Sequence, residues 1–153
     1  MNHDERINDN WLYFDITTQE RDSAIRFILG SLINARQEAN FPSNYYTFDE
    51  DVNVYLAHLL FAISLPEYHE MAEPYLSLET SNVLQMVRET EDRTVRYFIF
   101  KVNADHMMVH TAIFNDLGQK HPYRFFHNSA KHYRELAKLY YDQAAAYHRR
   151  IYR

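Results

Sequence analysis

The stretch from Thr94 to Leu117 constrains the fold most, because it is the longest run in the chain that is apolar on more than one side. Placed on an α-helix, its apolar residues cover two opposite faces, and a helix that is apolar nearly all round is normally buried among neighbours. Asp92 or Thr94 can cap its start, and Gly118 stands where a left-handed C-terminal stop is favourable. We therefore predict one long, buried helix over residues 94–117.

A β-hairpin is the alternative structure for this stretch. Its strands would run over residues 95–102 and 106–114, on either side of residues 103–105. These strands do not alternate cleanly between apolar and polar residues, and the loop lacks the glycine that such a turn prefers. The helix is therefore the favoured interpretation.

The composition favours an all-α fold. The 153 residues include only 2 glycines and 4 prolines, too few for the many tight turns of an all-β sandwich. The chain is tyrosine-rich, and its 13 tyrosines and 10 phenylalanines supply rings for packing between helices. Cysteine is absent, which excludes disulfides, zinc fingers and thiol catalysis and fits a reducing compartment.

Two capping boxes mark the starts of further helices, Thr17-x-x-Glu20 and Thr47-x-x-Glu50. The second opens a segment that is apolar on most sides, so we expect it to form the centre of the fold together with the 94–117 helix.

The whole pattern predicts an all-α, single-domain bundle of about five helices with two largely buried central helices. Residues 67–74 are expected to form a connector that includes about one helical turn, and the pattern leaves open whether a break precedes Thr94. The five helices cover about residues 20–39, 49–65, 78–89 and 94–117 and a segment that follows Pro122.

The last helix carries a seam in which small and aromatic residues recur at alternating spacings of four and three. In such a heptad seam the small residues let a neighbouring helix approach, and the rings fill the gaps. Its members are Phe126, Ala130, Tyr133, Ala137, Tyr140, Ala144, Tyr147 and Ile151.

The length suits one domain with a real core. We expect residues 1–10 to be flexible and residues 11–153 to form a single helical domain. The first ten residues are polar, unlike a signal peptide, and Arg96, Lys101 and Asp105 interrupt the best candidate for a membrane span. We therefore expect a cytoplasmic protein with no membrane segment.

The net charge of -5 is unevenly distributed along the chain. Residues up to Leu117 include 8 basic and 19 acidic side chains, whereas the remainder includes 8 basic and 2 acidic ones. A basic tail can contact nucleic acid or an acidic partner. Here the basic residues are spread round the last helix, which favours packing against the acidic part of the chain or of a second subunit. Nucleic-acid binding is the weaker alternative, through Lys131, Arg134, Lys138, Arg149 and Arg150.

Two segments carry a recognisable motif. Residues 104–108 followed by 111–114 resemble a pattern of glycine-aspartate, an apolar pair, then a small residue and Leu-Phe. Phe125-Phe126, Ser129 and residues 133–137 match a second pattern of Tyr-Tyr, a small residue and Ala-Tyr-x-x-Leu-Ala. Over roughly its last third the chain thus resembles an uncharacterised family of bacterial all-helical proteins.

The resemblance has departures that bear on function. Ala104 and Ala112 stand where the family has glycines, and His106 and His110 replace residues that are usually apolar or aromatic. The family has no assigned activity, so the resemblance implies a bacterial helical fold without implying a reaction. It also argues against a family-wide catalytic role for the two histidines.

His106 and His110 nevertheless form, with Asp105, the cluster most suggestive of chemistry. Their spacing places two imidazoles one turn apart on one helical face, where they can hold one metal ion. No glutamate follows His106 directly, and the Glu-x-x-His pairs of di-iron bundles are missing from the sequence. The alternative is a pair of core histidines bonded to carbonyls or tyrosine hydroxyls. Further ligands would have to come from His58, Glu67, His69, His127 or His132.

Asp105 lies to the side of the face that the histidines share. A carboxylate in an apolar helix is costly unless it is paired. We predict a partner from the last helix, Arg134 or a tyrosine hydroxyl, that fixes the register of the two helices. Asp105 and Arg134 are thus predicted to form a structural polar cluster.

The sequence contains no glycine-rich phosphate loop and no nucleophile elbow. The first hypothesis is a non-enzymatic protein that acts through protein–protein contacts, as a homo-oligomer joined by its aromatic-rich helix faces or with another protein. The alternative is a bundle that binds a metal ion or a small ligand through Asp105, His106 and His110.

Overall fold

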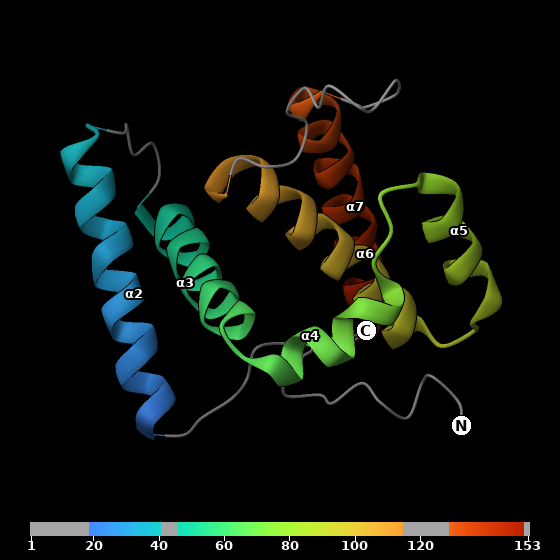
Figure 1. Cartoon of the computed structure of the whole chain (residues 1–153), viewed down its shortest axis with the longest axis horizontal. Coiled ribbons are helices and arrows are strands. Elements are labelled where there is room, and N and C mark those ends of the chain that lie inside the picture. Colours follow the sequence, from blue (N-terminus) through green and yellow to red (C-terminus); the bar gives the residue numbers. More distant parts are fainter. Residues whose placement is uncertain (1–18, 41–45, 115–128, 152–153) are drawn as a thin grey trace. The chain divides into compact units, whose positions relative to one another are not determined.

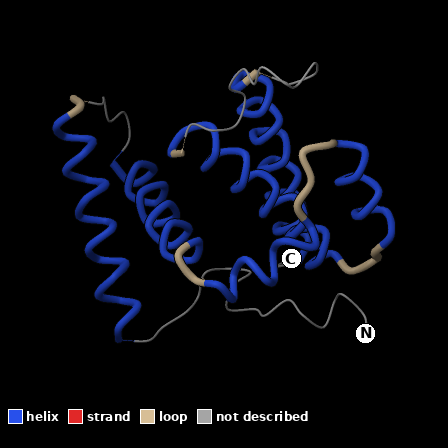
Figure 2. The backbone as a smooth tube through the Cα atoms, viewed as in Figure 1, coloured by secondary structure: helices blue, strands red, loops and turns tan. Residues whose placement is uncertain are grey.

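The computed structural model describes residues 19–40, 46–114 and 129–151, and every regular element within these ranges is helical (Figures 1 and 2). The predicted all-α fold is therefore confirmed. Within the same ranges, no helix is long and apolar enough to cross a membrane.

The chain divides into two compact units, residues 1–71 and 72–153. The single domain expected over residues 11–153 stays a prediction, and the flexible segment expected over residues 1–10 lies outside the described residues.

The first unit contains α2 (Gln19–Glu38), α3 (Tyr46–Ile63) and α4 (Pro66–Ala72). Helix α2 packs against α3, and Arg36 Nη1 donates a hydrogen bond of 3.2 Å to Asn53 Oδ1 between them. The bend from α3 to α4 is held by His69, whose Nε2 lies 2.6 Å from the carbonyl oxygen of Ile63. The segment expected to be a connector is thus largely a short helix.

Four residues of helix α3 are buried, Asn53, Ala57, Leu59 and Ala62, while Val52 and Val54 are exposed. At 100° per residue Asn53 and Ala57 lie on one side of the helix and Leu59 and Ala62 on the opposite side, so the covered side of α3 changes along its length.

The second unit contains a single turn of 3-10 helix, η2 (Glu73–Tyr75), followed by α5 (Thr80–Glu89), α6 (Arg93–Met108), the π-helical turn η3 (Val109–Ile113) and α7 (Ala130–Ile151). Helices α6 and α7 share the most extensive packing in this unit, and α5 packs against α6 (Figure 1).

The break before Thr94, which the sequence left open, is real. Asp92 Oδ1 accepts a hydrogen bond of 2.8 Å from the amide of Thr94, so Asp92 is the cap of α6. Arg96 Nε donates to the carbonyl oxygens of Val87 and Thr90, at 3.1 and 2.8 Å. Arg96 thereby occupies carbonyls that the end of α5 cannot satisfy itself.

Residues 98–105 in the middle of α6 are buried on all sides, and the helical interpretation of this stretch is confirmed over the hairpin. Because an all-round apolar helix requires neighbours on every side, α6 is the helix about which the second unit is built. Its buried residues are Val95, Phe98, Ile99, Phe100, Lys101, Val102, Asn103, Ala104, Asp105 and Met107.

The prediction that one α-helix continues from residue 94 to 117 is wrong at the C-terminal end, because the α-helix stops at Met108. After Met108 the backbone widens into the π-helical turn η3, and the Phe114 amide donates 3.0 Å to the Val109 carbonyl, five residues back. Thr111 Oγ1 bonds the Met107 carbonyl at 2.7 Å, a local contact that competes with regular helical bonding. The proposed stop at Gly118 lies outside the described residues.

The predicted seam of α7 is confirmed from Tyr133 to Ala144, where Tyr133, Ala137, Tyr140 and Ala144 are all buried, while the seam residues Ala130 and Tyr147 are partly buried. The rings of Tyr140 and Tyr147 lie 5.7 and 6.0 Å from the ring of Phe100 on α6. Small and aromatic residues therefore alternate along the α6–α7 contact, as the spacing predicts.

Candidate functional site

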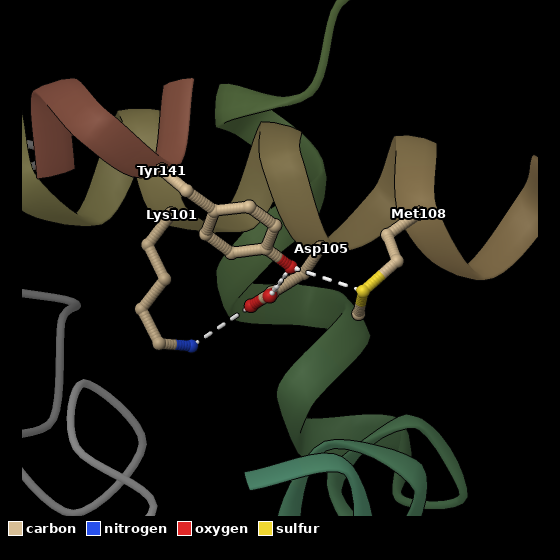
Figure 3. A network of polar contacts seen from close by, with 4 residues as sticks. All are labelled: Lys101, Asp105, Met108 and Tyr141. Atoms are coloured by element: carbon tan, nitrogen blue, oxygen red, sulfur yellow. Dashed lines mark hydrogen bonds and ion pairs between the residues drawn. The ribbon is translucent and has the colours of Figure 1, made fainter. Parts of the chain in front are cut away.

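Three polar side chains meet between α6 and α7. Lys101 Nζ lies 2.9 Å from Asp105 Oδ2, and the Tyr141 hydroxyl donates a hydrogen bond of 2.6 Å to Asp105 Oδ1 (Figure 3). Lys101 and Asp105 are only 3% and 1% exposed. We call these residues the Lys101–Asp105–Tyr141 network.

Helix geometry explains the network. Lys101 and Asp105 are four residues apart on α6, a spacing that brings oppositely charged side chains together on one face. Tyr141 directly follows the seam residue Tyr140 on α7, so its hydroxyl reaches across to the same carboxylate and also lies 3.6 Å from Met108 Sδ. The network therefore fixes the rotation of α7 against α6.

The tyrosine hydroxyl predicted as a partner of Asp105 is thus Tyr141. Arg134, the other predicted partner, is an exposed residue of α7, two turns before Tyr141. A guanidinium at the surface keeps its hydration, whereas burying a tyrosine hydroxyl costs less desolvation free energy than burying a charged group. The interhelical contact of the carboxylate is therefore made by the less polar partner.

Burial lowers the pKa of Lys101 from its ordinary value of 10.5, and the attraction and hydrogen bond of Asp105 only partly offset this effect. Between the folded pKa and 10.5 the unfolded chain binds more protons than the folded one. The free energy of unfolding therefore rises with pH in that window, and at lower pH the cost of burying the charged ammonium is fully present.

We expect Lys101→Met to remove this rise. The measurement is urea unfolding of both chains at several pH values below 10.5, where the difference in unfolding free energy should grow with pH in favour of the wild type. Burial raises the pKa of Tyr140 from 10.0, so its titration lowers the free energy of unfolding at higher pH. Because both chains keep Tyr140, this contribution cancels when their unfolding free energies are subtracted. Parallel curves for the two chains would contradict the prediction.

A second buried polar residue, Asn103, joins α6 to the segment before α5. Its Nδ2 donates to the carbonyl oxygens of Tyr75 and Ile99, both at 2.8 Å, and its Oδ1 accepts from the Ser77 amide at 3.0 Å. Among the described residues, every buried side-chain nitrogen or oxygen has a hydrogen-bond partner. The polar groups of α6 are therefore satisfied from within, which is the condition for burying them.

His106, His110 and Phe114 form a ladder of rings that continues from α6 into η3. The ring centroids of His106 and His110 are 4.3 Å apart with planes tilted by 45°, and those of His110 and Phe114 are 5.4 Å apart. Both histidines are partly exposed, and the ladder ends at the surface, where Phe114 is 54% and its neighbour Ile113 is 44% exposed.

Asp105 and the two histidines do not share one site. The carboxylate is held by Lys101 and Tyr141, whereas the imidazoles contact each other at a tilt and His110 contacts Phe114. Two imidazoles one turn apart can chelate one ion. In the part of the chain that the structure describes, no group of three or more His, Cys, Asp or Glu side chains is placed to hold a metal.

The other histidines proposed as ligands make contacts of their own. In the first unit, His58 Nδ1 lies 2.8 Å from the Val54 carbonyl, and His69 contacts Ile63 as described above. His132 is exposed on α7 and packs edge-on against Tyr133, and His127 lies outside the described residues.

Sequence reasoning missed Lys101, Tyr141 and Asn103 as members of polar sites. The spacing of Lys101 and Asp105 was an available signal, because opposite charges four residues apart on a helix attract. Nothing in the pattern singled out Tyr141 among the 13 tyrosines, and nothing paired Asn103 with residues 75–77.

Comparison with protein-family models, with curated proteins and with solved structures found no match to this chain. The resemblance of its last third to an uncharacterised bacterial family therefore stays a prediction.

Proposed function

We propose that this protein acts through protein–protein contacts, above all with a second copy of itself, and does not catalyse a reaction. The observation that carries the proposal is the apolar end of the ring ladder, where Ile113 and Phe114 are both exposed. Single exposed apolar residues are ordinary, but two adjacent ones that extend a row of rings form the kind of apolar patch that partners cover.

The Lys101–Asp105–Tyr141 network supports the non-catalytic part of the proposal. Its two charged side chains are at most 3% exposed, so a substrate could reach them only if α6 and α7 separated. The network is better suited to fixing the register of two helices than to transferring a proton to a ligand.

The exposed face of α7 supports a protein partner rather than a nucleic acid. Its basic residues Lys131, Arg134 and Lys138 stand among the acidic Glu135 and Asp142, and Lys131 Nζ lies 3.9 Å from Glu135 Oε1. A surface that binds phosphates usually carries mainly positive side chains. Salt-dependent retention on a nucleic-acid column would count against this part of the proposal.

We expect the double variant Ile113→Ser/Phe114→Ser to weaken self-association by about tenfold or more, because exposed aromatic anchors at an interface commonly contribute that much. The measurement is sedimentation velocity over a range of protein concentrations. The matched control is Leu139→Ser, which removes an exposed apolar side chain from α7 (60% exposed) and should leave the association constant unchanged. A wild-type chain that stays monomeric at every concentration would overturn the proposal.

A second candidate function is metal or small-ligand binding, which the 4.3 Å approach of His106 and His110 favours. The proposal keeps the two histidines and leaves out Asp105, whose carboxylate is already engaged. Elemental analysis of protein purified without an affinity tag tests it, and substoichiometric metal would count against it.

We also propose a bacterial origin and a cytoplasmic location. The origin rests on the resemblance alone, and the location is supported by a chain without cysteine.

A further inference from the structure

His106 and His110 have the geometry of half a metal site. Their ring centroids are 4.3 Å apart, and two imidazoles on one tetrahedral ion, each with its nitrogen about 2.0–2.1 Å from the metal, have centroids about 5 Å apart. A small rotation of the two partly exposed rings would convert the observed arrangement into the metal-bound one. Each ring ligates through one nitrogen, so the other nitrogen can keep a hydrogen bond to its surroundings, as metal-bound histidines usually do.

The half-site has no further protein ligand among the described residues. No third His, Asp or Glu is grouped with the pair there, and the adjacent Asp105 carboxylate is held by Lys101 and Tyr141. A zinc ion in a structural site is four-coordinate and binds four side chains. Two of the four ligands must therefore come from outside this set.

We propose that a divalent transition-metal ion of the zinc class bridges two copies of the chain through His106 and His110 of each. A two-fold axis brings the same surface of both copies together, so each pair meets its own equivalent and the four imidazoles complete a tetrahedral site. This inference rests on the proposed self-association, and it identifies what the second copy contributes.

The surroundings of the pair suit this arrangement. The ladder of rings leads from His106 and His110 to Phe114, and Ile113 and Phe114 supply exposed apolar surface beside the ligands. On dimerisation these side chains would exclude water from the rim of the metal site, where a low dielectric strengthens metal–ligand bonds. The π-helical turn sets their position, and such turns often occur at functional sites.

The test uses the full chain without an affinity tag, freed of metal with a chelator and titrated with zinc chloride alone. We expect one zinc ion per two chains by calorimetry, and a dimer dissociation constant at least about tenfold lower with zinc than with chelator in sedimentation equilibrium. Cobalt(II) in place of zinc should give the intense visible absorption of a tetrahedral site, a readout that needs no variant.

The variant His106→Asn/His110→Asn should lose the zinc dependence, and the control His132→Asn, which removes an exposed histidine of α7, should retain it. A dimer that forms equally well in chelator and in zinc would overturn the metal bridge but support the proposed self-association. Monomers under both conditions would overturn both proposals. Zinc bound one to one on a monomer, or a zinc-dependent dimer that survives the double variant, would overturn the bridge through these residues.

Discussion

Replacing Asp105 with alanine is expected to lower the free energy of unfolding by about 3–5 kcal/mol, the usual cost of removing one partner of a buried ion pair. The loss arises because the Lys101 ammonium, 3% exposed, would stay buried without its carboxylate, and the Tyr141 hydroxyl would lose its acceptor at 2.6 Å. For a chain of this size the loss corresponds to a fall in Tm on the order of 10 °C. Thermal and urea unfolding measure it.

The control is Asp142→Ala, which removes an exposed carboxylate from α7 and should change stability far less. Tyr141→Phe should cost about 1.5–3 kcal/mol, the range for a hydrogen bond to a charged group. The double variant Lys101→Met/Asp105→Leu should recover most of the stability lost in Asp105→Ala, because it leaves no charge buried. Equal melting curves for Asp105→Ala and Asp142→Ala would show that the network does not hold α6 to α7.

Much of this fold follows from local signals in the sequence. The apolar stretch after Thr94 needs neighbours on all sides, and α6 has them, because its hydrophobic residues are not confined to one stripe. The seam of α7 could be predicted from its spacing of four and three, because that period keeps one face toward a neighbour. The cost of a buried carboxylate likewise required a partner for Asp105, and the tyrosine alternative names the right kind of group.

What the sequence could not supply depends on contacts between distant residues or on small shifts of the backbone. The π-helical turn after Met108 is a difference of one residue in hydrogen bonding, which the apolar pattern does not record. Asp105 and His106 are neighbours in the chain, yet one faces the Lys101–Asp105–Tyr141 network and the other joins the ring ladder. Their adjacency in the sequence therefore does not place Asp105 and His106 in one site.

Asn103→Ala is expected to destabilise the second unit by about 2–4 kcal/mol, because the buried Tyr75 carbonyl and the partly buried Ser77 amide would lose their partner at about 1–3 kcal/mol each. The wild-type amide donates to the Tyr75 carbonyl and accepts from the Ser77 amide, so one side chain bonds both the end of η2 and the residues that follow it. The alanine also leaves a small void beside fully buried neighbours such as Phe98 and Ile99.

The residues that lose hydrogen-exchange protection in Asn103→Ala distinguish the loss of these hydrogen bonds from a destabilisation of the whole unit. Hydrogen exchange of the Ser77 amide should accelerate in Asn103→Ala even under conditions where α6 amides stay protected, because that amide depends on the asparagine oxygen alone among its described bonds. Gln85→Ala is the matched control, since Gln85 is exposed on α5 and its side-chain amide donates to the Glu89 carboxylate at the surface. If Ser77 exchanges at the wild-type rate in Asn103→Ala, the segment from 75 to 77 is held by its apolar contacts, such as the edge-on packing of Tyr75 against Phe98, and the asparagine contributes little to its order.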